Sequence, residues 1–188
     1  MSLPEHLEKF LGTVRGGWSQ TADGRRMEFT VVDFAGGSRL NEHAFATLGL
    51  SKIPLHSPSH TEHIYQELVI VVPETLGLVP VPDTLQHVAQ EAVATGQAVV
   101  RGNVIGPRGP LFYDDSKMEA LYAANPWIFP NEFATYREKD RDVSIVWLVP
   151  ISRGEAEFVR LRGWHQFEDE LAKANPDLVD IKREPIFR

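Results

Sequence analysis

Residues 143–171 read VSIVWLVPISRGEAEFVRLRGWHQFEDEL, and two structural signals follow one another in this stretch. Residues 143–151 are apolar except for Ser144, which is typical of a strand buried on both faces of a sheet. Ser152 and Glu155 then have the spacing of a capping box, in which each residue's side chain satisfies a backbone N–H at the start of a helix. The stretch predicts a buried strand that leads directly into a capped helix.

The residues after the capping box have apolar side chains three or four positions apart, at Phe158, Leu161, Trp164, Phe167 and Leu171. This spacing places the five side chains on one face of an α-helix. We therefore expect a single helix over residues 152–171, with that face packed against a sheet.

Hydrophobic patterns on either side of this stretch predict further strands. They are expected at residues 29–34, 43–48, 64–72 and 97–105. The strand at 64–72 ends in an apolar run, so we expect it in the centre of the sheet. Prolines, glycines and polar residues predict loops at residues 52–62 and 106–116.

Cap and stop signals predict three further helices. They are expected at residues 2–15, capped by Ser2 and ended by Gly16 and Gly17, at 83–95 with Asp83 as the cap, and at 117–124. Together the elements predict an α+β fold, with a mixed, largely antiparallel central sheet covered by helices. No stretch has the composition of a linker, so residues 1–188 are expected to form one domain.

The composition limits the classes of partner. The 188 residues include 19 lysines and arginines against 26 aspartates and glutamates, for a formal net charge of −7. Such a surface repels phosphate backbones and suits a basic protein partner, so nucleic acid is not expected as a ligand.

The chain has no cysteine, which excludes disulfides, thiolate metal sites, iron–sulfur clusters and a catalytic thiol. No apolar run matches a secretory signal or a membrane span, so we expect a soluble cytoplasmic protein.

Three histidines lie close together in the expected loop 52–62 and just after it. His56, His60 and His63 have the spacing H-x-x-x-H-x-x-H, and Glu62 is adjacent to the last. Imidazoles this close can hold zinc, nickel or copper. The alternative is that they are ordinary exposed histidines, which Pro58 favours because it prevents one regular face from presenting all three. A metal-dependent or small-molecule activity here is one hypothesis, with Glu62 or His63 as a general base, but no cofactor is predicted.

The remaining sequence has no recognisable catalytic motif. The glycines of GNVIGPRGP at residues 102–110 lack the Lys-Ser/Thr pair of a phosphate-binding loop, and no G-x-S-x-G elbow is present. The loop at 106–116 instead carries Phe112, Tyr113, Asp114 and Asp115, an aromatic and acidic group that fits a recognition surface. The alternative is that Phe112 and Tyr113 anchor the loop on the core.

From about residue 44 onward, the order of several short segments resembles the Suppressor of fused (SUFU) domain family. The matching segments are FATLGLS at 45–51, QELVIVV at 66–72, LQHVAQEAVATG, RGNVI, SKMEALYAANP, WLVPISRGEAEFVRLRGWHQFEDEL at 147–171, and DIKREP with Arg183. The resemblance implies a SUFU-like core over residues 44–188, preceded by an N-terminal helix and strand extension at 1–43.

The resemblance also implies a non-enzymatic function, because the SUFU family has no known catalytic residues. Its animal members are cytoplasmic and bind transcription factors of Hedgehog signalling, and they have a further C-terminal domain that this chain is too short to contain. The chain is therefore similar to single-domain, bacterial-type members, which look like immunity proteins of toxin systems. In the animal proteins the matching region borders the groove where a partner peptide adds to the sheet, and an acidic residue follows the glycine. This sequence has Asn103 at that position instead, so we do not expect the same peptide specificity.

The sequence therefore predicts a non-enzymatic protein-binding module, most concretely an antitoxin-like protein that neutralises a basic toxin or effector. The expected partner-binding residues are Asn103, Phe112, Tyr113, Asp114, Asp115 and Trp127. The alternative is the activity at His56, His60 and His63. An edge strand would allow a homodimer, although the pattern does not indicate one.

Overall fold

The computed structural model describes residues 1–39, 41–58, 60–77 and 80–187, with the side chain of residue 60 excepted. In this part of the chain the strands form one sheet in the order β1-β2-β3-β5-β9-β7-β6, with β4 paired to β5 and β8 paired to β9. The strands are β1 Gly12–Gln20, β2 Arg26–Gly36, β3 Glu42–Leu48, β4 Leu55–Ser57, β5 His60–Pro73, β6 Val104–Ile105, β7 Met118–Ala124, β8 Thr135–Arg137 and β9 Asp142–Ser152.

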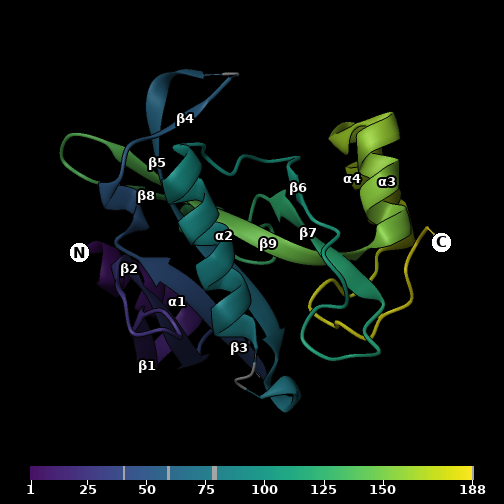
Figure 1. The fold of residues 1–188 in the computed structure, drawn as a ribbon, viewed down its shortest axis with the longest axis horizontal. Coiled ribbons are helices and arrows are strands. Elements are labelled where there is room, and N and C mark those ends of the chain that lie inside the picture. The colour runs from purple at the N-terminus through teal and green to yellow at the C-terminus, as the bar shows by residue number, and fades with distance from the viewer. Residues whose placement is uncertain (40, 59, 78–79, 188) are drawn as a thin grey trace.

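The helices cover both faces of this sheet (Figure 1). They are α1 Leu3–Leu11, α2 Val81–Thr95, α3 Arg153–Arg162 and α4 Trp164–Ala174, with short 3₁₀ turns η1 Leu50–Lys52, η2 Glu74–Leu76 and η3 Asn131–Ala134. Helix α2 packs with Leu68 and Ile70 of β5 in one hydrophobic cluster. The other three helices pack with Val69 and Val71 in a second cluster. Successive β5 side chains thus face opposite layers.

The predicted mixed, largely antiparallel sheet is confirmed. Only β5 and β9 are parallel among the described strand pairs, in register from Tyr65 opposite Val143 to Val69 opposite Trp147. Beyond this register β5 continues beside β3, and β9 continues beside β7. The two central strands therefore part toward their carboxyl ends. Within the described ranges, no helix has the length and apolar character needed to cross a bilayer.

The first helix is shorter than its apolar pattern predicts. The Ser2–Glu5 capping box starts α1, but the helix ends at Leu11 rather than near Gly16. Gly12 takes φ +97° and opens β1, and a Cβ at this position would lie 2.2 Å from the carbonyl oxygen of Ala35. Only glycine fits this close approach, and its positive φ turns the chain out of the helix. Val14 is therefore an exposed strand residue instead of part of the helix's apolar face.

The prediction of a helix at residues 117–124 is wrong, because these residues form β7. Local helix propensity is overridden by pairing with β9, in which Leu121 lies opposite Pro150. The adjacent side chains Leu121 and Tyr122 are both buried, in the two different hydrophobic clusters. A segment that buries both faces in this way is more stable as a sheet strand than as a surface helix.

Three further predictions are corrected. The strand expected at 97–105 consists only of β6 and a single bridge at Gln97, because a turn intervenes at Gly102 with φ +92°. The loop expected at 52–62 contains the last residue of η1, all of β4 and the start of β5. Helix α2 begins at Val81 with Pro80 as its N-cap, so Asp83 lies within the first turn instead of capping it.

The helix expected over residues 152–171 is divided at Gly163, which has φ +86°. Helix α3 ends at Arg162, and a separate helix, α4, begins at Trp164. Leu161 is consequently 82% exposed, whereas Phe167 and Leu171 of α4 are buried. The helical spacing of the sequence continued across the break and so placed Leu161 on the wrong face.

His6 of α1 should make the stability of the protein depend on pH. The ring is 3% exposed, its Nε2–H donates to the Phe133 carbonyl at 3.2 Å, and burial lowers its pKa below the ordinary value. Protonation thus favours the unfolded chain, whose histidine pKa is about 6.5. The contribution of neutral His6 is complete above that pH and is lost as pH falls through the lowered folded-state pKa.

We expect His6→Gln to flatten the urea-unfolding free energy between pH 7.5 and pH 5. The wild-type protein should lose about 1.4 kcal/mol over this interval for each unit by which the folded-state pKa is lowered. His165→Gln changes an exposed histidine in the same way and should leave the wild-type pH dependence in place. An equal effect of the two substitutions would contradict the assignment to His6.

Candidate functional site

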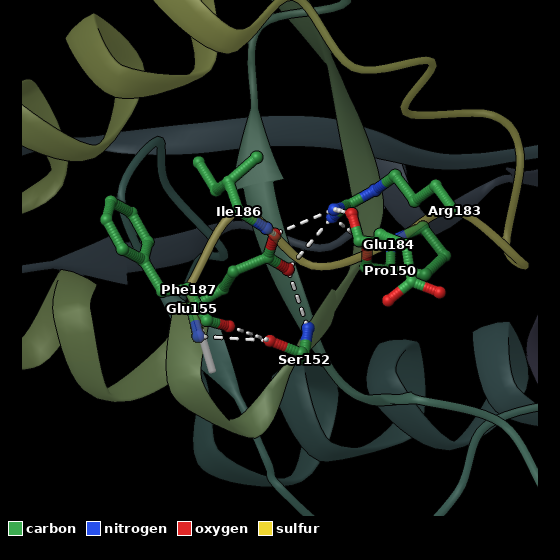
Figure 2. Close-up of polar contacts among 7 residues, drawn as sticks. All are labelled: Pro150, Ser152, Glu155, Arg183, Glu184, Ile186 and Phe187. Atoms are coloured by element: carbon green, nitrogen blue, oxygen red, sulfur yellow. Dashed lines mark hydrogen bonds and ion pairs between the residues drawn. The ribbon is translucent and has the colours of Figure 1, made fainter.

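The junction of β9 and α3 carries the predicted capping box, which is confirmed. Ser152 is the N-cap of α3, and its Oγ accepts a hydrogen bond from the Glu155 backbone N–H at 3.1 Å. In return, Oε2 of Glu155 accepts from the Ser152 backbone N–H at 2.8 Å (Figure 2). Glu155 is fully buried, so a carboxylate lies at the base of the helix with no contact to solvent.

Arg183 pairs with this carboxylate from the C-terminal tail, which we define as residues 175–187. Its two terminal nitrogens donate to Oε1 and Oε2 of Glu155 at 2.7 and 2.9 Å (Figure 2). Together with the backbone N–H groups of Ser152 and Ile186, they give Glu155 four donors. Such saturation offsets the cost of burying the charge. We call Ser152, Glu155 and Arg183 the latch.

Further contacts extend the latch along the tail. Arg183 also donates to the Pro150 carbonyl of β9 at 3.3 Å, and Oγ of Ser152 donates to the Phe187 carbonyl at 3.3 Å. The Phe187 ring stacks on Phe158 of α3, with centroids 4.0 Å apart. The tail has no helix or strand of its own, so these contacts hold it in place.

The tail crosses from one layer of the protein to the other. Leu178 and Val179 pack in the cluster that contains α1, whereas Ile181 packs in the cluster that contains α2. The crossing lies near the carboxyl ends of β5 and β9, where Arg183 reaches the Pro150 carbonyl. The latch therefore fixes the segment on which Ile181 enters the second layer.

A groove of about 490 Å³ lies where the tail meets the loop at 106–116. It is lined by Pro73, Thr75, Leu76, Tyr113, Asp115, Lys117, Asp180, Ile181 and Lys182. The Tyr113 hydroxyl donates to the Ile181 carbonyl at 3.3 Å and joins the two walls. Lys117 pairs with Glu184 of the tail. The latch, the tail and the loop thus form one connected set of contacts.

The aromatic and acidic residues of the loop divide into anchors and exposed groups. Phe112 is 8% exposed and packs in the α2-side cluster, with φ +71°. Tyr113 is half-buried. Asp114 and Asp115 are exposed, and within the described residues neither carboxylate takes part in a hydrogen bond or an ion pair. Phe112 is therefore positioned to anchor the loop, while the two aspartates project outward.

The other two predicted partner-binding residues lie outside the groove. Oδ1 of Asn103 accepts from the Val100 backbone N–H at 2.9 Å, so this side chain stabilises the turn before β6. Trp127 is 44% exposed and packs edge-to-face on Trp147 of β9. Tyr113 and Asp115 alone among the six predicted residues line the groove.

The histidines lie in the β4–β5 hairpin. The His56 and His63 rings have centroids 4.5 Å apart, and the side chain of His60 falls outside the described part of the chain. No group of three or more potential metal ligands occurs among the residues that are described. The metal hypothesis stays a prediction.

The pairing of Glu155 with Arg183 is the feature that the sequence did not reveal. Glu155 was identified only as a capping residue, and Arg183 lies 28 positions further along the chain. No local pattern links residues at this separation. The one available signal was that Arg183 lies in the DIKREP segment, which is among the segments that carry the family resemblance.

We expect Arg183→Met to destabilise the protein by roughly 3–5 kcal/mol, because it leaves the buried Glu155 carboxylate without its counter-charge. Urea unfolding at pH 7 measures this loss. Arg153→Met is the matched control, since it breaks the exposed pair of Arg153 with Glu119 and should cost less than about 1 kcal/mol. A similar loss in both variants would contradict the role of the latch.

Three solved structures have a fold similar to that of this chain. A crystal structure assigned as a SUFU homolog from Neisseria gonorrhoeae FA 1090 superposes with a TM-score of 0.75 and 21% identity, over 96% of this chain and 92% of that one. The crystal structure of a Sufu–Fu complex superposes with a TM-score of 0.58 and 15% identity, over 98% of this chain and 81% of the matched chain. The crystal structure of Drosophila Suppressor of Fused superposes with a TM-score of 0.59 and 17% identity, over 83% of this chain and 42% of the Drosophila chain. At these identities the likeness shows the fold.

A match to a sequence model of a protein family shows the family of this chain. A search of curated proteins finds no match. A family model described as Suppressor of fused protein (SUFU) matches residues 26–184, which include β2, the latch and the loop at 106–116. Because this match spans most of the chain, the protein belongs to the Suppressor of fused family, as the sequence resemblance predicts.

Proposed function

We propose that this protein is a non-enzymatic, cytoplasmic protein-binding module that holds a basic partner on Asp114 and Asp115 beside the groove. The observation that carries this proposal is the pair of exposed carboxylates on a loop that is fixed from beneath by Phe112 and Tyr113. A surface that is already ordered loses little conformational entropy when it binds.

The lack of counter-charge at Asp114 and Asp115 supports the proposal. Several exposed acids of the protein are paired, such as Glu91 with Arg108 and Glu170 with Lys173, whereas Asp114 and Asp115 are adjacent in the chain and have no counter-charge among the described residues. An unpaired acidic pair attracts cations at no cost of breaking an internal contact. The net charge of −7 adds a long-range attraction for a basic protein and raises the rate of encounter.

The relatives supply a second line of support, because one of the similar structures is a Sufu–Fu complex. Within our proposal, the partner of this chain is a basic toxin or effector. The module acts as an immunity protein that covers the partner's active surface. The side chains that line the groove, including Tyr113 and Ile181, would contribute apolar contacts that slow dissociation.

We expect the double substitution Asp114→Asn/Asp115→Asn to weaken the complex roughly tenfold or more, because it removes two charge-assisted contacts. The partner is first identified by capture from native cytoplasm and mass spectrometry, and its affinity is then measured by calorimetry. Glu8→Gln/Glu132→Gln removes the same charge from exposed sites elsewhere and should change affinity by less than about twofold.

Two results would contradict the proposal. Equal losses in the two double variants would show that only the net charge matters. Capture of no protein partner, with a metal or small molecule retained on untagged protein instead, would favour the alternative at the β4–β5 histidines, where the His56 and His63 rings are adjacent.

A further inference from the structure

Trp127 forms one wall of a second hollow, of about 400 Å³, on the side of the protein that carries α4. The other lining residues are Glu168, Leu171, Ala172, Asn175, Pro176 and Leu178. The Trp127 ring is 44% exposed, and its centroid lies 5.5 Å from that of the fully buried Trp147. This edge-to-face contact fixes Trp127 from within and leaves part of its ring open to solvent.

A carboxylate lies in the same hollow and is held rigidly. Glu168 accepts from Nε of Arg101 at 3.0 Å and from the Tyr122 hydroxyl at 2.7 Å, both on Oε1. A second guanidinium nitrogen of Arg101 donates to Oε2. Because each carboxylate oxygen can accept two hydrogen bonds, Oε2 retains one acceptor position.

The hollow also lies at the carboxyl end of α4, where the helix dipole is negative. Asn175 takes φ +44° and its backbone N–H bonds to the Leu171 carbonyl. Pro176 follows and has no N–H to offer to the carbonyls of the last turn. The aromatic face and the helix end thus favour a cation at this place, and Glu168, whose charge Arg101 already balances, adds the free acceptor position of Oε2.

The chain contains a comparable contact that is already filled. The Arg101 guanidinium lies over the Trp164 ring, 4.4 Å from its centroid, while it also pairs with Glu168. Within the described residues no cation lies over Trp127. Trp127 therefore offers, on the open side of α4, an aromatic face like the one that Arg101 covers at Trp164, next to the remaining acceptor position of Glu168.

We propose that this hollow binds the guanidinium or ammonium group of an arginine or lysine side chain of a protein partner. The cation lies over the Trp127 ring and within reach of Oε2 of Glu168, and its aliphatic stem packs on Leu171 and Leu178. This inference deepens the proposed function and rests on it for the basic character of the partner. It concerns a surface separate from Asp114 and Asp115.

The test uses small probes and needs no identified partner. Nα-acetyl-arginine amide and Nα-acetyl-lysine amide are titrated at millimolar concentration against ¹⁵N-labelled protein, and the four tryptophan indole N–H signals are followed. Nα-acetyl-citrulline amide is the control, because it has nearly the shape of arginine without the charge. We expect saturable shifts at Trp127 and its neighbour Trp147, with the cations binding at least about threefold more tightly than citrulline.

Variants at Trp127 separate ring chemistry from simple hydrophobic contact. Trp127→Phe should keep the preference for cations, read from backbone amides of α4, and Trp127→Leu should abolish it. The thermal midpoint of each variant checks that the fold is retained. Equal binding of citrulline and arginine, shifts no larger at Trp127 than at Trp18, or a preference that survives Trp127→Leu would overturn the proposal. None of these results depends on whether Asp114 and Asp115 bind a partner.

Discussion

The bidentate ion pair between Glu155 and Arg183 is the constraint on which the tail and the groove depend. A buried carboxylate is stable only when its acceptor positions are filled, and Glu155 obtains its donors from α3's own cap, from Arg183 and from the Ile186 backbone. One side chain thus joins the start of a helix to a tail that has no regular structure. The tail in turn holds Ile181 in the α2-side cluster and presents its carbonyl to Tyr113.

This arrangement places two candidate recognition surfaces on different layers of the protein. The loop at 106–116 is anchored through Phe112 in the cluster that contains α2, whereas Trp127 packs on Trp147 in the cluster that contains the other helices. The loop carries two unpaired carboxylates, whereas the one carboxylate beside Trp127 is paired with Arg101, and a buried aromatic side chain supports each surface from beneath.

The sequence allowed the central strands, the α3 cap and the α+β class to be predicted, because these features depend on patterns within about ten residues. It misled where tertiary pairing outweighed local preference, as in β7, and where one glycine redirected the chain, as at Gly163. For the candidate site, the sequence predicted a recognition surface on the loop at 106–116 and left open whether Phe112 is an anchor or a contact; in the structure Phe112 is buried. The latch joins residues 28 positions apart, so no local pattern could predict it.

The central claim is that the latch holds the loop at 106–116 in its observed conformation through the tail. Native-state hydrogen exchange of wild-type and Arg183→Met protein tests this claim directly. We predict that exchange in the tail, and at the Tyr113 and Ser116 amides that bond to the Leu111 and Tyr113 carbonyls, accelerates beyond the global loss of stability, which the core amides of α2 report. Faster exchange confined to the tail, with the loop amides unchanged, would contradict it.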